Sequence, residues 1–231
     1  MQLPYSLPPY SYAGNRMLVV TFRTEPEFLG RLVPDGLVPN SDSLINAFVG
    51  DLRIVAPMDI SYYEAGYFFA ASFGRREGFY VPALYLDRSM PITIGREIWG
   101  YPKISADDFS LTEEGGRLQT KVVKDGLTLI EASMRLGTAR PRKTIHAEDF
   151  VLKLIPTVTG DANFAVKQLA AVPVIQTLNE SYTVEEISMR LGELSKGQPD
   201  AIPVLEIVGG LYAADCALEL NSGEVLHDYL A

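Results

Sequence analysis

Apolar and polar residues alternate along most of this chain, which is the pattern of half-buried strands. Leu118, Thr120 and Val122 form one side of such a stretch. The turn Lys124-Asp125-Gly126 follows it, and an Asp-Gly turn between two alternating runs predicts a β-hairpin whose second strand covers 127–136. The same reasoning predicts strands over 17–23, 44–55, 66–73, 79–86, 91–95, 150–155, 165–176 and 204–219.

One short helix is predicted after the first of these strands. In Thr24-Glu25-Pro26-Glu27, Thr24 can cap the helix, Glu27 completes a Thr-x-x-Glu capping box, and proline is tolerated in the first turn. Its apolar face consists of Phe28, Leu29, Leu32 and Val33, and Pro34-Asp35-Gly36 ends it.

The scarcity of helix-length segments excludes a parallel sheet, because parallel strands need long crossover connections. The fold class predicted is therefore α+β and predominantly antiparallel β, with a meandering sheet that curls or closes. No repeat or composition change divides the chain, so a single domain over 1–231 is expected, with Pro/Tyr-rich residues 1–15 as an extended N-terminal arm.

Composition narrows the class of protein. A hydrophobic fraction of 47% and a charged fraction of 21% in 231 residues are those of a soluble globular protein. The net charge of −9 argues against nucleic acid as a partner. It also means that an anionic substrate would need a local arginine. No run approaches the ~20 apolar residues that cross a bilayer.

The single Cys216 excludes an intramolecular disulfide and a cysteine metal cluster, and it is expected in the core. The N-terminus lacks the basic and apolar regions of a signal peptide. A cytoplasmic location is therefore expected.

The segment Gly95-Arg96-Glu97-Ile98-Trp99-Gly100-Tyr101-Pro102-Lys103 places one lysine among apolar and aromatic residues. Burial disfavours the charged form and lowers the pKa of a lysine. A neutral Lys103 amine could form a Schiff base with a carbonyl substrate. The alternative is a lysine whose stem lies on apolar surface while its ammonium reaches water.

This segment resembles the signature of the acetoacetate decarboxylase family, whose Schiff-base lysine follows a Gly-Arg-Glu…Tyr-Pro stretch. The resemblance extends over nearly the whole chain. It includes Asn15-Arg16 with Phe22-Arg23-Thr24, Tyr63-Glu64-Ala65-Gly66, Phe150-Val151-Leu152-Lys153-Leu154-Ile155-Pro156 and Asp228-Tyr229-Leu230. It implies a cone-like double β-barrel with peripheral helices and the lysine inside, no cofactor, and a homo-oligomer. It also favours a strand over 182–194, where Val184, Ile187, Leu191 and Leu194 stand at helical spacing.

Carried over residue by residue, the resemblance implies four catalytic residues. Lys103 is the nucleophile, Glu64 a proton carrier, Arg16 a ligand for the substrate carboxylate, and Tyr101 a hydrogen-bonding or wall residue. Further pocket candidates are Arg96, Glu97, Trp99, Ile104 and Tyr85. Without the resemblance, Glu64 could equally be a solvated loop acid, and Arg16 a surface residue.

The chain departs from the family pattern at two charged positions. Ile104 stands where the family has a second lysine, which removes a neighbouring positive charge. Val49 stands where a second glutamate is expected, and whether Asp51 replaces that acid stays open.

Other chemistry has little support in the sequence. His146 and His227 lack metal-ligand spacing, and Gly74-Arg75-Arg76-Glu77-Gly78 is interpreted as a hairpin turn rather than a phosphate loop.

Three functions are compatible with these residues. The first is a cofactor-independent Schiff-base lyase that decarboxylates acetoacetate or a related β-keto acid through Lys103. The second is an aldolase-dehydratase that uses the same imine with pyruvate or another keto acid. The third is a non-catalytic barrel that binds a small ligand while Lys103 stays protonated.

Overall fold

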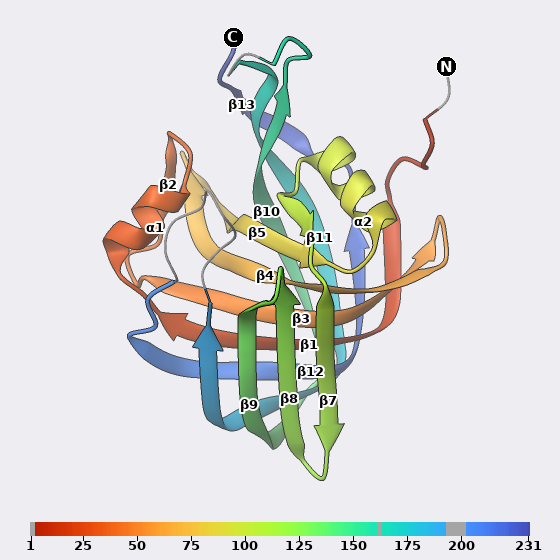
Figure 1. Ribbon diagram of the computed structural model, residues 1–231, viewed down its shortest axis with the longest axis vertical. Coiled ribbons are helices and arrows are strands. Elements are labelled where there is room, and N and C mark those ends of the chain that lie inside the picture. Colours follow the sequence, from red (N-terminus) through yellow and green to blue (C-terminus); the bar gives the residue numbers. More distant parts are fainter. Residues whose placement is uncertain (1–2, 161–162, 193–201) are drawn as a thin grey trace.

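The computed structural model describes residues 3–160, 163–192 and 202–231, and strands dominate it (Figure 1). The strands are β1 (Tyr10–Arg23), β2 (Leu37–Pro39), β3 (Leu44–Ala56), β4 (Ile60–Phe73), β5 (Arg76–Leu86), β6 (Lys103–Ser105), β7 (Asp108–Glu114), β8 (Arg117–Lys124), β9 (Leu127–Arg140), β10 (Lys143–Pro156), β11 (Phe164–Leu191), β12 (Glu206–Leu220) and β13 (Glu224–Asp228). The helices are α1 (Pro26–Leu32), α2 (Ser89–Ile94) and a π-helical turn, η1 (Gly95–Trp99).

The strands form one sheet in the order β10-β5-β4-β3-β1-β12-β11-β9-β8-β7. Its pairings are antiparallel except for β10 with β5 and β5 with β6. β10 also pairs with β11, so the path from β10 to β11 closes into a ring. The predicted antiparallel, curled sheet is therefore confirmed.

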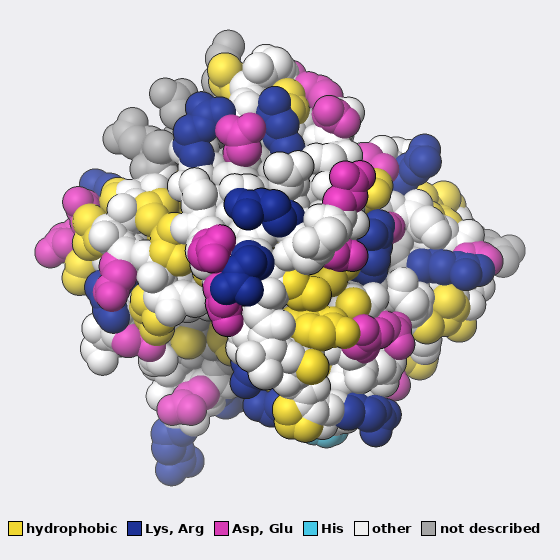
Figure 2. All heavy atoms as spheres, turned by 90° about the horizontal axis from the view of Figure 1, so that it is seen from below, with side chains coloured by type: hydrophobic (Ala, Val, Ile, Leu, Met, Phe, Trp, Pro, Cys, Tyr) yellow, Lys and Arg dark blue, Asp and Glu magenta, His cyan; other side chains and the backbone are white. Residues whose placement is uncertain are grey.

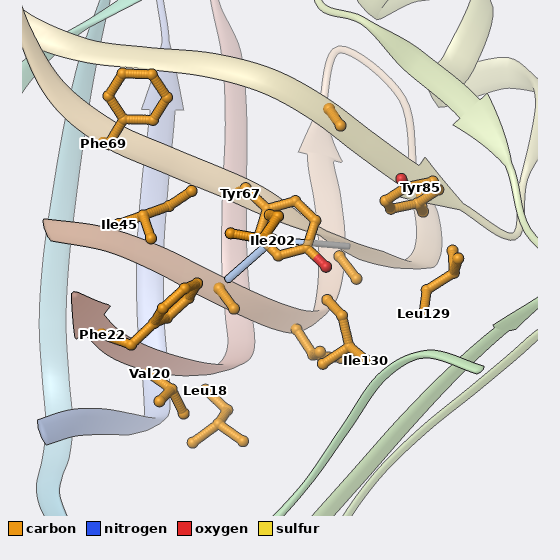
Figure 3. Close-up of a cluster of buried hydrophobic side chains, with 14 of the residues drawn as sticks. Leu18, Val20, Phe22, Ile45, Tyr67, Phe69, Tyr85, Leu129, Ile130 and Ile202 are labelled. Carbon is orange, nitrogen blue, oxygen red and sulfur yellow. The ribbon is translucent and has the colours of Figure 1, made fainter. Parts of the chain in front are cut away.

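The strands of this ring send alternate side chains into two cores. The apolar core, shown in Figure 3, gathers Leu18, Val20, Phe22, Ile45, Tyr67, Phe69, Tyr85, Leu129 and Ile130 with their neighbours. The mixed core, named for the polar groups described below, gathers Tyr12, Phe48, Tyr62, Leu84, Leu86, Trp99, Tyr101 and Val151. On β5, for example, Tyr85 points into the first and its neighbours Leu84 and Leu86 into the second.

The outer surface carries charge of both signs. Figure 2 shows basic and acidic side chains interspersed over one face of the molecule, with hydrophobic groups between them. Within the part of the chain that the structure describes, no helix has the length and apolar character to cross a membrane.

Several local predictions are confirmed. The β8–β9 hairpin forms at Asp125-Gly126, and Leu118, Thr120 and Val122 are buried. The predicted hairpin turn forms at Gly74-Arg75, while Arg76 to Gly78 already belong to β5, and Cys216 is buried. The ambiguous segment 182–194 is a strand as far as Leu191, while Leu194 lies outside the described residues.

The strand predicted over 91–95 is wrong, because these residues belong to α2 and the start of η1. Ile92, Thr93 and Ile94 have strand propensity, but propensity yields to packing when a helix can bury the right side chains. Pro91 lies in the first turn of α2, where proline is tolerated, and Ile94 enters the mixed core. Arg96 and Glu97 follow on the π-helical turn η1.

The N-terminal arm is shorter than predicted, since β1 begins at Tyr10. Tyr10 and Tyr12 are buried and pair with Leu220 and Leu218 of β12. This alternation was present in the sequence directly after Pro9, where it marks the start of the strand.

The capping box is also wrong. Helix α1 begins at Pro26, so Glu25 takes the capping position and makes no side-chain cap. Proline is best placed as the first helical residue, which moves the helix start one residue past Thr24. The Thr24 hydroxyl is buried without a hydrogen-bond partner among the described residues.

Candidate active site

Lys103 lies at the start of β6 and forms an ion pair with Glu64 of β4. Lys103 Nζ donates a hydrogen bond to Glu64 Oε2 at 2.7 Å. The two residues are only 6% and 8% exposed. Register explains the meeting: Glu64 pairs with Leu86 on β5, and Lys103 pairs with Leu84 two residues away, so both side chains share the face of the mixed core. Two opposite charges are thus held together inside the protein.

Gly95 makes room for the lysine side chain. A Cβ atom built on Gly95 would lie 2.6 Å from Lys103 Cδ, 2.7 Å from Cε and 3.3 Å from Nζ. Real Cβ atoms essentially never approach other heavy atoms below 3.0 Å. The first glycine of the signature is therefore required by the path of the Lys103 side chain.

Two tyrosine rings flank the Lys103 ammonium. Its Nζ lies 5.8 Å from the ring centre of Tyr62 and 5.6 Å from that of Tyr101. A cation at this distance is attracted by the ring face, by about 0.5–2 kcal/mol depending on exposure. Burial raises the pKa of both tyrosines well above its ordinary value, so both keep their hydroxyl protons at neutral pH. The hydroxyls of Tyr62 and Tyr12 share a hydrogen bond.

Tyr101 joins Lys103 to a second acid, Asp149 on β10. Tyr101 Oη donates a hydrogen bond to Asp149 Oδ2 at 2.7 Å. Burial raises the pKa of the Asp149 carboxyl to about 6, an effect that the Tyr101 hydrogen bond partly opposes. The charge of Glu64 raises this pKa further and the charge of Lys103 lowers it. The ionisation of Asp149 is thus coupled electrostatically to the charges of Glu64 and Lys103.

The turn that carries this group is held by backbone contacts. The Gly95 carbonyl accepts hydrogen bonds from the N–H groups of both Gly100 and Tyr101, which closes η1. Gly100 has a φ of +92°, and a Cβ there would lie 2.4 Å from Lys153 Cβ. Lys153 Nζ donates to the carbonyls of Glu97 at 2.7 Å and Ile98 at 3.0 Å. Strand β10 therefore braces the turn from outside.

The remaining residues of the signature have different positions. Arg96 donates to the backbone carbonyl of Lys103 at 3.2 Å, so it holds the main chain at Lys103. Trp99 is buried, donates from Nε1 to the Asn221 carbonyl, and packs edge-on near Tyr101. Glu97 is exposed and accepts a hydrogen bond from Tyr5 of the N-terminal arm.

Three positions singled out in the sequence face the apolar core instead. Ile104 pairs with Tyr85 across β6 and β5, and both contribute to that core. Val49 is buried there too. A charge at position 104 would therefore project away from Lys103 Nζ, and the consequence predicted from the missing second lysine does not follow. Tyr85 and Ile104 do not join the pocket expected around Lys103.

Arg16 is placed differently from expectation. Its Nη2 lies 2.6 Å from Asp51 Oδ2, and these two side chains are 38% and 32% exposed. Arg16 pairs with Asp51 across β1 and β3, whereas Glu64 pairs with Gly50. Because adjacent positions face opposite sides of a sheet, Arg16 and Asp51 lie on the opposite face from Glu64. The structure brings Lys103, Glu64 and Tyr101 together but not Arg16.

Asp149 and Tyr62 were missed in the sequence, although both carry a signal. Tyr62 stands two residues before Glu64, and Asp149 stands two residues before the buried Val151. Alternation puts each on the inward side of its strand. An acid on the buried stripe of a strand was the available indication.

The resulting arrangement can perform proton chemistry on a carbonyl compound. It holds one amine, two carboxyl groups and two protonated tyrosines inside a largely apolar core. A surface hollow of about 270 Å³ lies beside η1 and is lined by Pro8, Trp99, Lys153 and other residues, but not by Lys103. The ion pair of Lys103 and Glu64 thus lies away from this hollow.

Comparison with known proteins gives a consistent result. The family model described as Acetoacetate decarboxylase (ADC) matches residues 2–230. Among curated proteins, the acetoacetate decarboxylase of Burkholderia multivorans is 28% identical over 236 residues, covering 98% of this chain and 92% of its relative. That of Burkholderia ambifaria is 29% identical with the same coverage.

Solved structures share the fold. A crystal structure of acetoacetate decarboxylase from Legionella pneumophila superposes with a TM-score of 0.84 at 22% identity, covering 100% of this chain and 92% of the other. The enduracididine biosynthesis enzyme MppR complexed with pyruvate gives a TM-score of 0.81 at 17% identity, covering 98% and 93%.

Proposed function

Since this chain belongs to the acetoacetate decarboxylase family, we propose that it is a cofactor-independent Schiff-base lyase that decarboxylates acetoacetate or a related β-keto acid at Lys103. The observation that carries the proposal is the buried pair of Lys103 and Glu64, 2.7 Å apart beside Tyr62 and Tyr101. An ion pair so deeply buried gives little stability in return for its desolvation, which favours a chemical role.

Imine formation needs a base and then an acid, and we assign both roles to Glu64, which lies 2.7 Å from Lys103 Nζ. Its carboxylate takes a proton from the Lys103 ammonium, and the neutral amine attacks the ketone carbon of the substrate. The nitrogen then passes one proton to the former carbonyl oxygen, which gives the neutral carbinolamine. The carbinolamine hydroxyl then receives the proton from Glu64 and leaves as water. The product is a protonated imine, whose positive charge stays beside the Glu64 carboxylate and the two tyrosine rings.

The protonated imine is an electron sink. In a β-keto acid, the bond to the carboxylate lies one carbon away, so its electron pair can move into the carbon–nitrogen system as carbon dioxide leaves. This gives a neutral enamine. Protonation of the enamine carbon and hydrolysis of the imine release a ketone and restore Lys103.

Borohydride trapping tests the imine directly. The protein is incubated with acetoacetate, longer β-keto acids or pyruvate, reduced, and analysed by intact and peptide mass. We expect an adduct on the Lys103 peptide, and none on a Lys103→Ala variant whose circular dichroism matches the wild type. Absence of an adduct with every keto acid would refute the proposal.

The alternatives separate in the same experiment. An aldolase-dehydratase would form the adduct with pyruvate and give a condensation product with an aldehyde, without releasing carbon dioxide. The absence of a second glutamate at Val49 is the reason to run this arm. A non-catalytic binding protein would form no adduct and leave Lys103 in its ion pair.

A further inference from the structure

Asp149 ends a short series of contacts that leads to the Lys103 amine. Tyr101 Oη donates to its carboxylate at 2.7 Å, and the Tyr101 ring centre lies 5.6 Å from Lys103 Nζ. Asp149 pairs with Val172 of β11 and alternates with Val151, both in the mixed core, so its side chain shares the face of Glu64. The mechanism above gives Asp149 no task.

The same mechanism lacks a proton source for the enamine carbon. Glu64 lies 2.7 Å from Nζ and is therefore committed to the nitrogen end of the imine. Its carboxylate also balances the charge of the protonated imine. The carbon that loses carbon dioxide lies farther along the substrate, where a second acid is needed.

Building on the proposed function, we infer that Asp149 and Tyr101 form a proton relay that protonates the enamine carbon. In its carboxylic acid form Asp149 donates its O–H to Tyr101 Oη, and the Tyr101 proton passes to the carbon. The enamine double bond supplies the electron pair of the new C–H bond, and the nitrogen becomes a protonated imine. Asp149 is left as a carboxylate and regains its proton from water before the next turnover.

The electrostatics of Asp149 suit this task. Burial raises the pKa of its carboxyl to about 6, so both forms are accessible near neutral pH. Efficient general acids have a pKa close to the working pH. The titratable groups that act on Asp149 are Tyr101, Glu64 and Lys103, while its opposite neighbours on β5 and β11 are Phe79 and Val172.

Exchange of the ketone product's α-hydrogens for deuterium isolates the proposed step. In D₂O, the ketone product exchanges its α-hydrogens through the imine and the enamine, using the relay in both directions without any carbon–carbon cleavage. We expect Asp149→Asn to form the borohydride-trapped Lys103 adduct at close to the wild-type rate. Its exchange, followed by proton NMR, should fall by about 10²-fold. Tyr101→Phe should behave alike, and Asp149→Glu should recover part of the loss.

Glu148→Gln is the matched control. Glu148 neighbours Asp149 on β10 but binds Arg76 instead of the mixed core, so its exchange should stay at the wild-type rate. The relay is refuted if Asp149→Asn exchanges normally, or if it loses trapping and exchange equally. A wild-type protein that traps no adduct overturns the proposed function and the relay together, whereas normal trapping with normal exchange in Asp149→Asn overturns the relay alone.

Discussion

The two cores filled by the same strands treat their polar groups in opposite ways. In the apolar core, Tyr67 is 1% exposed and its hydroxyl has no hydrogen-bond partner among the described residues. In the mixed core, Glu64 bonds to Lys103, and Asp149 to Tyr101. Apolar packing dominates the first core, while the second contains a buried ion pair and a second carboxyl group that packing does not require. The comparison separates the part of the molecule that stabilises it from the part that we propose is reactive.

The largest effect is expected from replacing the buried ion pair. Lys103→Met leaves the Glu64 carboxylate buried without its partner, which should lower the free energy of unfolding by about 3–5 kcal/mol. Lys103→Met with Glu64→Leu should recover that loss, because apolar residues of similar size often replace a buried pair without cost. Both variants should lose about 10⁴-fold or more in turnover. Urea unfolding and carbon dioxide release measure the two effects, and turnover by the double variant would contradict the division between the cores.

The apolar core should respond in stability alone. Phe69 is fully buried and packs edge-on against Tyr80, so Phe69→Ala should cost about 3–5 kcal/mol of unfolding free energy. Turnover per folded molecule should stay close to wild type, measured well below the melting temperature. A large loss of turnover in the folded fraction would show that the two cores are not separable.

The raised pKa of Asp149 should be visible in how the free energy of unfolding depends on pH. Its pKa is about 6 in the folded protein against an ordinary value of 3.8, so the folded state holds this proton more tightly. The resulting stabilisation is complete below the ordinary value and disappears as the pH rises to about 6. Relative to wild type, Asp149→Asn should therefore gain unfolding free energy over this range, on the order of 3 kcal/mol at neutral pH.

Asp59→Asn should change the pH dependence of the free energy of unfolding in the opposite direction. The hydrogen bond from Arg53 lowers the pKa of the exposed Asp59 carboxyl. The contribution of Asp59 should therefore be present near neutral pH and fade as the pH falls through the carboxyl range. Urea unfolding at several pH values compares the three proteins, and parallel curves for wild type and Asp149→Asn would contradict the raised pKa.

The substitution Gly95→Ala should disturb only the position of the Lys103 side chain. The new Cβ would meet Lys103 Cδ and Cε at 2.6 and 2.7 Å, and moving the amine by about 1 Å should cost roughly 10²-fold in turnover. Gly30→Ala is the control, since nothing lies within 4 Å of its Cβ position in α1. That change should leave turnover unaffected and add up to about 1 kcal/mol of stability. Equal turnover in the two variants would show that Gly95 does not set the position of the amine.

The smallest effect is expected from Arg16→Gln. The ion pair with Asp51 is about one-third exposed and faces away from Glu64, so its loss should change stability by less than about 1 kcal/mol. Turnover and KM should remain within a few-fold of wild type. A KM raised about 100-fold would return Arg16 to the role of carboxylate ligand that the sequence suggested.

Strand identity was predictable because alternation is a local property. The β8–β9 hairpin followed from Leu118, Thr120 and Val122 together with the Asp-Gly turn. The α2–η1 helical pair was not predictable in the same way, because its β-branched residues favour a strand in isolation. Only the mixed core, into which Ile94 and Trp99 pack, makes the helical conformation favourable.

The grouping of the site was partly predictable. The resemblance supplied Lys103, Glu64 and Tyr101, which the structure brings together. Asp149 was not found because its partner Tyr101 lies 48 residues earlier, and only the packing of β10 against the turn brings them together. The position of Arg16 depends on its register with Asp51, which motifs do not reveal.

Strand β10 contacts the Gly95–Tyr101 turn in two ways. Its Lys153 donates hydrogen bonds to the Glu97 and Ile98 carbonyls from outside, and its Asp149 accepts a hydrogen bond from Tyr101 in the interior. A chain emerging from the ribosome carries Lys103 some forty residues before Lys143, where β10 begins. Until that strand docks, the Gly95–Tyr101 turn lacks its brace and Tyr101 lacks its acid. The contacts that Lys153 and Asp149 make with this turn therefore exist only in a molecule in which β10 has paired with β5 and β11.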